Sequence, residues 1–182
     1  MSGPDTIVRF WREAGPKAWF RKDPAFDAEI RRRFEADHHS AARGEHDGWA
    51  QTATGALGLL LLFDQFPRNL WRDSAHAFAT DPLARGVARA AIAAGHDRAV
   101  EIILQPFVYI PFMHAETPGD QDESVRLLEG LKARGGADNL HFAREHRDIV
   151  ARFGRFPHRN RCLARETSPD EQAFLDGGGF SG

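Results

Sequence analysis

Apolar residues recur at helical spacing along most of the chain. Residues 5–14 carry them three and four positions apart, which indicates a short amphipathic helix. A second stripe runs through 24–43 and begins after Asp23-Pro24, a capping residue followed by a first-turn proline. No segment sustains the apolar-polar alternation of a strand. The pattern therefore predicts an all-α protein.

The most apolar stretch is residues 49–66. Within it, 56–63 is hydrophobic on every side. A helix that is apolar all round is buried all round, so we expect this helix at the centre of the fold. We expect it to end before Pro67, because proline has no N–H for the helix ladder.

The second half of the chain predicts shorter helices. In these helices we expect Leu83, Phe142 and His146 to face inward, the histidine in the middle of an apolar stripe. A further helix is expected to begin at Asp81-Pro82, with Asp81 as its N-cap residue. The predicted ranges are 83–94, 98–104, 107–115, 120–133, 138–153 and a short capped helix over 168–175.

Length and composition limit the alternatives. At 182 residues, 42% of them hydrophobic, the chain suits one domain over 1–182, with a loose glycine-rich tail at 177–182. No apolar stretch approaches the length of a membrane span, and a signal peptide is not apparent, so we expect a cytoplasmic protein with no membrane partner. The net charge of −2 makes nucleic acid an unexpected partner. The sequence indicates no cofactor and leaves the oligomeric state open.

Three polar stretches stand out from this helical pattern, at 62–69, 111–116 and 153–161. They concentrate arginine, histidine, asparagine and carboxylate side chains beside aromatics and prolines, more directed hydrogen-bonding capacity than a surface loop needs. We expect the three to meet. The binding side chains would be Asp64, Gln65, Arg68, Asn69, Arg155, His158, Arg159 and Asn160.

Two of these groups must be paired inside the protein. Asp64 falls on the apolar face of the central helix, so its carboxylate needs an arginine, either Arg68 or one from the last stretch. His146 needs a partner for a ring nitrogen, either a carboxylate or a backbone carbonyl. Each of these two pairings is compatible with a purely structural role, in which it ties helix ends together, and with a catalytic role. The catalytic candidates are His114, Glu116, His146 and His158.

A metal site is a weaker alternative. The same three histidines and Glu116 are acceptable zinc ligands, but they are scattered and form no close-spaced motif, so we predict no metal. Cys162 lies four residues after His158, and nothing further marks it as a nucleophile.

The polar stretches also carry a family resemblance. Its motifs are 19–22 with Phe26-Asp27 and Ile30, 64–69, 111–116 with Gln121, and 153–160. Through these motifs the chain resembles the bacterial domain of unknown function 924 family over about residues 7–176. The resemblance implies a tetratricopeptide-repeat-like fold of antiparallel helix pairs stacked in a superhelix, and it implies no known reaction. Where such proteins usually have glycine, this chain has Ala164.

Three functions fit these observations. The first is binding of a small anion or a peptide carboxylate at the polar centre, where the arginines offer donors. The second is a hydrolase that uses a carboxylate and a histidine as base and acid. The third is a protein-protein interaction scaffold whose polar centre only fixes the helices.

Overall fold

The computed structural model describes residues 1–181, and within them every regular element is helical. The all-α prediction is therefore confirmed. The elements are α1 (Pro4–Ala14), α2 (Pro16–Trp19), α3 (Pro24–Ala42), η1 (Asp47–Gln51), α4 (Ala53–Leu60), η2 (Leu61–Gln65), α5 (Phe66–Leu70), η3 (Ala75–Phe78), α6 (Asp81–Ala93), α7 (His96–Ala99), α8 (Pro106–Met113), α9 (Pro118–Ala133), α10 (Leu140–Phe153), η4 (Pro157–Arg159) and α11 (Pro169–Asp176).

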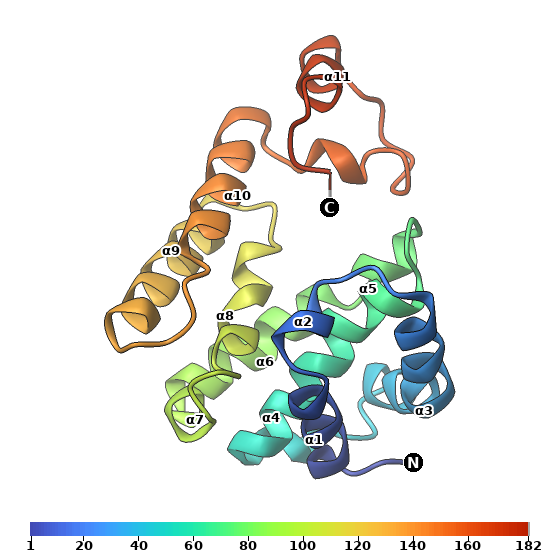
Figure 1. Cartoon of the computed structure of the whole chain (residues 1–182), viewed down its shortest axis with the longest axis vertical. Coiled ribbons are helices and arrows are strands. Elements are labelled where there is room, and N and C mark those ends of the chain that lie inside the picture. The colour runs from blue at the N-terminus through green and yellow to red at the C-terminus, as the bar shows by residue number, and fades with distance from the viewer. Residues whose placement is uncertain (182) are drawn as a thin grey trace.

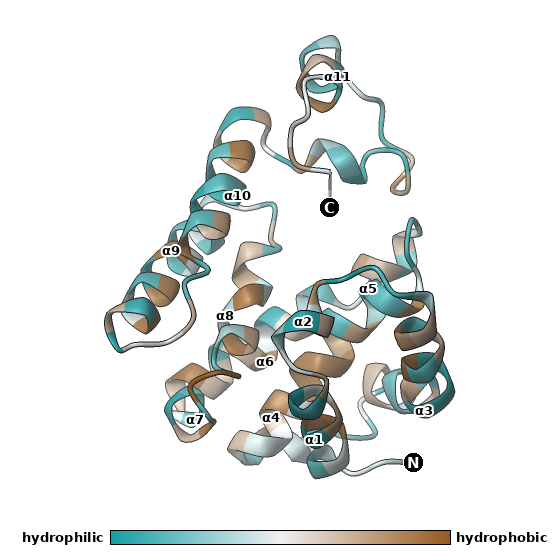
Figure 2. Cartoon of the chain, viewed as in Figure 1, coloured by the Kyte–Doolittle hydropathy of each residue, from teal (hydrophilic) through white to brown (hydrophobic). Residues whose placement is uncertain are grey.

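The apolar helix α4 lies at the centre, as its sequence predicts. Helices α1, α6 and α8 pack against it, and α9 and α10 extend the stack on the far side of α8 (Figure 1). Figure 2 shows the hydrophobic colour along α8, in the middle of the view, and on part of α4 below it. All leucines of α4 and η2 are at most 2% exposed.

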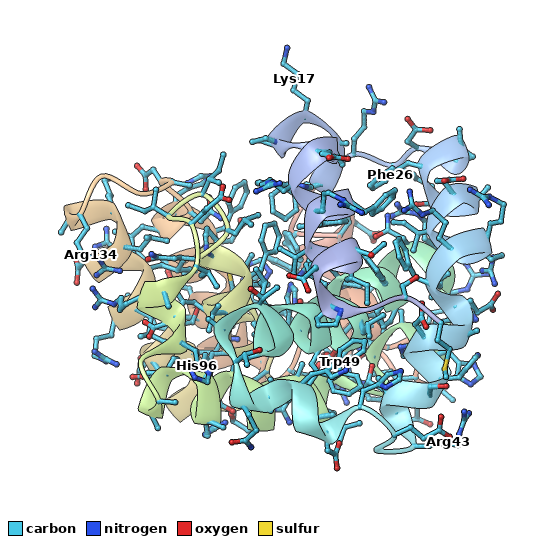
Figure 3. The ribbon with its side chains drawn as sticks, turned by 90° about the horizontal axis from the view of Figure 1, so that it is seen from below. Lys17, Phe26, Arg43, Trp49, His96 and Arg134 are labelled. Carbon is cyan, nitrogen blue, oxygen red and sulfur yellow. The ribbon has the colours of Figure 1, made fainter. Side chains whose placement is uncertain are left out.

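Aromatic rings join the N-terminal helices to this core. The ring of Phe26 turns in between α1 and α3 and stacks on Phe10 with centroids 5.5 Å apart, whereas Lys17 points away from the fold (Figure 3). Trp11 is fully buried and packs on Phe66 at 5.7 Å. These contacts attach α1 and α3 to the far end of the central helix.

The prediction that the central helix ends before Pro67 is wrong. The chain stays helical to Leu70 by widening into one π-helical turn, in which the Phe66 N–H bonds the Leu61 carbonyl. Proline and the π turn leave carbonyls without backbone donors. His38 Nδ1 meets the Leu62 carbonyl at 2.8 Å, and the Thr80 hydroxyl meets the Phe63 carbonyl at 2.6 Å.

Four smaller expectations are also wrong. Leu83 is 44% exposed and Phe142 45%, because the small residues Ala84 and Ala88 face the core in α6 and Ala143 does so in α10. The helix expected over 98–104 is only α7, His96–Ala99. The side chain of Asp81 makes no capping bond, and Thr80 occupies the N-cap position.

The last part of the chain packs around a separate small cluster. Its buried members are Ile149, Val150 and Phe156, and Phe174 and Phe180 cover it. That the whole chain forms one domain, that its helix pairs stack as in tetratricopeptide repeats, and that the tail is loose remain predictions; Gly182 of that tail lies outside the described residues. No helix in the described residues is long and apolar enough to cross a membrane.

Candidate functional site

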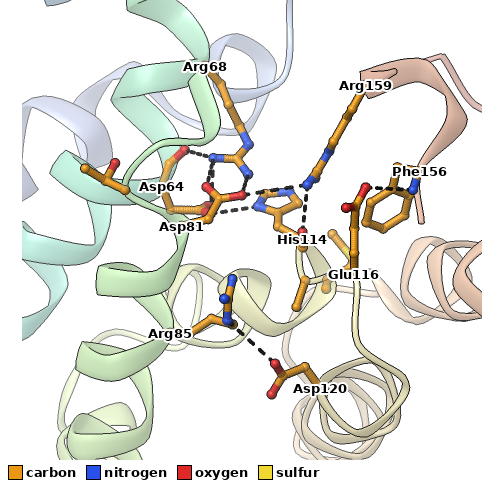
Figure 4. A network of polar contacts seen from close by, with 12 residues as sticks. Asp64, Arg68, Asp81, Arg85, His114, Glu116, Asp120, Phe156 and Arg159 are labelled. Atoms are coloured by element: carbon orange, nitrogen blue, oxygen red, sulfur yellow. Dashed lines mark hydrogen bonds and ion pairs between the residues drawn. The ribbon is translucent and has the colours of Figure 1, made fainter. Parts of the chain in front are cut away.

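The three polar stretches meet between η2, the end of α8 and η4 (Figure 4). His114 Nδ1 lies 2.7 Å from Asp64 Oδ1. Arg159 donates to the His114 carbonyl at 3.0 Å, and the backbone N–H of Phe156 donates to Glu116 at 2.8 Å. These bonds link positions 40 to 50 residues apart in the sequence.

Two carboxylates hold Arg68. Its two terminal nitrogens reach the two oxygens of Asp81 at 3.1 Å each, and Nη1 lies 3.3 Å from Asp64 Oδ1. Asp64 is 1% exposed. Burial is the largest effect on its pKa and raises it, but Arg68 and His114 together outweigh burial and lower the pKa to about 2. Asp64 is therefore ionised at neutral pH.

The neighbouring His114 is neutral. Burial, followed by the positive charge of Arg68, lowers its pKa to about 4, although Asp64 acts in the opposite direction. Because a carboxylate only accepts, Nδ1 carries the proton and donates to Asp64. Nε2 then holds a lone pair and makes no hydrogen bond to another described residue. Unlike Nδ1, it is not enclosed by a partner in the protein.

Glu116 belongs to a different pair from His114. Arg165 grips it with both terminal nitrogens, at 2.6 and 3.0 Å, and also donates to the Phe156 carbonyl at 3.1 Å. Burial raises the pKa of Glu116, but the bonds from Arg165 and Phe156 outweigh it and lower the pKa. The α8 helix ends at Met113, and beyond it His114 bonds Asp64 whereas Glu116 bonds Arg165. Glu116 is occupied and is not positioned as a free base.

Arg159 is the least satisfied charge in this centre. It is 6% exposed, and its guanidinium lies between the rings of Phe78 and Phe156, 4.5 Å from each centroid. Nη1 donates to the His114 carbonyl. The nearest carboxylate oxygen, Oδ2 of Asp81, lies 3.8 Å from Nη1. Burial and then Arg68 lower its pKa to about 10, so it stays charged at neutral pH.

One edge of this guanidinium makes no hydrogen bond to any described residue. Nε of Arg159 is enclosed without a hydrogen-bond partner, and Nη2 makes no bond to any described residue. These two N–H groups form the edge of a guanidinium that can donate one hydrogen bond to each oxygen of a carboxylate. The same edge is filled by Glu29 on Arg32, Asp27 on Arg72, Glu123 on Arg126 and Glu171 on Arg155.

Two more histidines, His146 and His158, pack on Phe156. The ring of His146 is 6.5 Å from that of His114 and 5.3 Å from that of Phe156, between centroids. Its Nδ1 meets the Phe142 carbonyl at 2.8 Å, the backbone partner that the sequence left open. Burial lowers the pKa of His146 to about 4 and that of His158 to about 3, with Arg159 adding to both shifts.

Some residues of the predicted site lie elsewhere. Asn69 donates to Asp27 at 2.7 Å, in a cluster with Arg72. Arg155 pairs with Glu171 of α11 at 2.6 Å. Of the other two predicted binding residues, Gln65 bonds Asp64 at the edge of the centre, and the side-chain oxygen of Asn160 accepts from Arg165 at 3.0 Å.

The sequence missed Asp81, Phe78, Arg165 and Phe180. The sequence predicts Asp81 as a helix-capping residue because it precedes a proline. Phe78, Arg165 and Phe180 lie outside the three polar stretches. Two surface cavities, of about 600 and 350 Å³, contain none of the predicted binding residues. Among residues 1–181 no three histidine, cysteine or carboxylate side chains gather as metal ligands, and Cys162 contacts the Arg159 carbonyl at 3.2 Å.

The fold and site together define an all-helical protein with a charged network that joins three distant stretches. A family model, described as bacterial protein of unknown function (DUF924), matches residues 7–179. The chain therefore belongs to this family. A solved structure of a protein of unknown function from Agrobacterium tumefaciens is 52% identical, with a TM-score of 0.91 over 96% of this chain and 97% of that one. A comparison with curated proteins finds no match.

Proposed function

We propose that the polar centre binds a small oxyanion, a phosphate or a carboxylate, on the unbonded Nε–Nη2 edge of Arg159. The observation that carries the proposal is the buried guanidinium whose Nε has no partner while Nη2 is unbonded. A buried charged donor without an acceptor is costly, so an anion that fills this edge gains more there than on a hydrated arginine.

The neighbouring carboxylates are already paired, which favours an anion from outside the protein over one of its own side chains. Asp81 is already bonded through both oxygens to Arg68, and Glu116 through both to Arg165. The Arg159 guanidinium packs on the rings of Phe78 and Phe156, so its edge is preorganised and little side-chain entropy is lost on binding.

The test is a calorimetric titration with inorganic phosphate and with acetate at low and high salt. Binding should weaken with salt, because screening reduces the attraction. Arg159→Lys keeps the charge, loses the two-pronged edge and should abolish measurable binding. Arg126→Lys is the matched control, since its edge holds Glu123 at an exposed site. Absence of binding at millimolar anion in the wild type, or equal binding by Arg159→Lys, would contradict the proposal.

A second candidate is a hydrolase. The observation that favours it is the Asp64–His114 pair, which fixes the proton on Nδ1 and leaves Nε2 as an acceptor for a water proton. A panel of chromogenic esters and phosphoesters tests it. Turnover that His114→Gln removes would support this reading, and no turnover by the wild type would leave binding alone.

A further inference from the structure

We infer that the ligand of the Arg159 site carries an aromatic ring, and that Phe180 of the C-terminal segment occupies the place of that ring in the free protein. The inference rests on the proposed function and names its ligand class: aryl carboxylates and aryl phosphates.

Phe180 closes the side of the site formed by two histidines. Its ring centroid lies 4.4 Å from that of His146 and 5.1 Å from that of His158. Both histidine rings also pack on Phe156, at 5.3 and 5.6 Å, and Phe156 covers the Arg159 guanidinium. The ring of Phe180 therefore lies among neutral rings that pack on Phe156, and Phe156 in turn packs on the Arg159 guanidinium.

The segment that carries Phe180 is weakly attached. Gly177, Gly178 and Gly179 each donate one backbone bond to the end of α11, and neither Phe180 nor Ser181 makes a hydrogen bond within the described residues. Gly178 has φ +80°, a left-handed conformation that glycine adopts without strain. Beyond Gly179 the segment is held by the packing of one side chain, so an external ring can replace it at little cost.

A bare anion would leave this place among the rings to Phe180. An aryl anion supplies both its charge to Arg159 and a ring to His146 and His158, and the exchange of one ring for another conserves the apolar contact. Ring stacking contributes a modest net gain only where no ring has to be displaced, which predicts that Phe180→Ala binds an aryl anion about threefold to tenfold tighter than its bare counterpart.

The experiment compares matched pairs that differ by one ring: phosphate with phenyl phosphate, and acetate with phenylacetate. Each is titrated by calorimetry into the full chain and into Phe180→Ala, and Phe20→Ala serves as the control because that ring is 65% exposed at another place. Phe180→Ala should tighten the two aryl anions about threefold to tenfold and leave the bare anions nearly unchanged, because only the aryl ligands compete with the ring. Phe20→Ala should change neither pair.

A second readout follows the segment itself. Chymotryptic cleavage after Phe180 should accelerate with phenyl phosphate and not with phosphate. If Phe180→Ala binds the bare anions but binds their aryl partners no tighter, the aromatic inference is overturned and the proposed function stands. Aryl binding that is weaker in Phe180→Ala than in the wild type would have the same meaning. Failure of phosphate and acetate to bind at all would overturn both.

Discussion

At Asp64, burial and charge act on the same carboxylate in opposite directions. A carboxylate that is 1% exposed is expensive to ionise, yet Arg68 at 3.3 Å and His114 at 2.7 Å keep it ionised. Arg68 is shared with Asp81, so the network is a chain of partners and not an isolated pair. Removing one member leaves the others buried and only partly satisfied.

Asp64→Ala should lower the free energy of unfolding by about 3 kcal/mol, because the N–H of His114 and one side of Arg68 lose their buried acceptor. Chemical denaturation measures the change. The control is Glu123→Ala, which breaks an exposed pair with Arg126 and should cost no more than about 0.5 kcal/mol. A loss at Asp64 as small as that of the control would contradict the assigned role.

His146 should make the fold sensitive to mild acid. Its pKa is 6.5 in the unfolded chain and about 4 in the fold, lowered by burial and then by Arg159 and Arg68, with His114 and His158 also facing it. The unfolded state therefore binds the proton first. Stability should fall as the pH drops from about 6.5 to 4, by up to about 1.4 kcal/mol per pH unit from this group.

His146→Gln removes this titration and should flatten the dependence of the unfolding midpoint on pH in that window. His141→Gln, at an exposed position of the same helix, is the control and should leave the slope as in the wild type. An unchanged slope in His146→Gln would show that other groups cause the acid sensitivity.

Ala164 occupies a left-handed conformation, φ +53°, which is uncommon for a residue other than glycine. The turn is fixed by the bond from the Arg165 N–H to the Asn160 carbonyl, 2.8 Å long. Because a Cβ is strained there, Ala164→Gly should stabilise the protein by about 1 kcal/mol in thermal unfolding. Ala173→Gly, in the middle of α11, should instead destabilise it by about 1 kcal/mol. Destabilisation by both would show that Ala164 carries no strain.

At the residue scale, the sequence predicts which polar groups are buried better than which groups they meet. The stripe spacing places Asp64 and His146 inside, and both are buried. Partner choice depends on chain segments whose approach no local pattern encodes. Arg155 and Arg159 are four residues apart, yet one turns to Glu171 and the other to the centre, because Pro157 begins a separate short helix between them.

At the element scale, the π-helical turn is what positions Asp64. The widened turn carries the helix through Pro67 and turns Asp64 and Arg68 toward Asp81 and His114. The sequence marks the proline but not the π turn, because the donors that make the turn tolerable, His38 and Thr80, come from distant segments. The prediction for the inward face of α6 is wrong because it also depends on distant segments. Neighbouring helices pack closely there, so alanines face the core and Leu83 lies at the surface.

Thr80→Val should destabilise the fold by about 1–3 kcal/mol, since it leaves the buried Phe63 carbonyl without its donor. Thr80→Ser keeps a hydroxyl and should cost less. In a Pro67→Ala background the restored backbone N–H can serve the same carbonyl, so Thr80→Val should cost about 1 kcal/mol less there. A double-mutant cycle by denaturation measures this, and additive costs would show that the proline does not create the need for Thr80.

At the scale of the whole molecule, the chain has a large core and a small one. The large core runs from Ile7 to Ala143, and the small one has three buried members around Phe156. The two are tied by polar contacts as well as by α10. The main polar tie is Glu116, after α8, which binds Phe156 and Arg165.

Glu116→Ala should therefore loosen the C-terminal part before the rest. Without the carboxylate, the Phe156 N–H and the Arg165 guanidinium lose charge-assisted bonds, and backbone amides over 155–176 should exchange with solvent about tenfold faster. Amides of α4 should keep their wild-type rates, because the large core does not depend on this contact. Hydrogen exchange on the full chain measures both regions at once. Glu129→Ala, which removes an exposed pair with Arg144 between α9 and α10, is the control and should change neither. If α4 and 155–176 accelerate together, the two cores open as one cooperative unit, and Glu116 stabilises the entire fold.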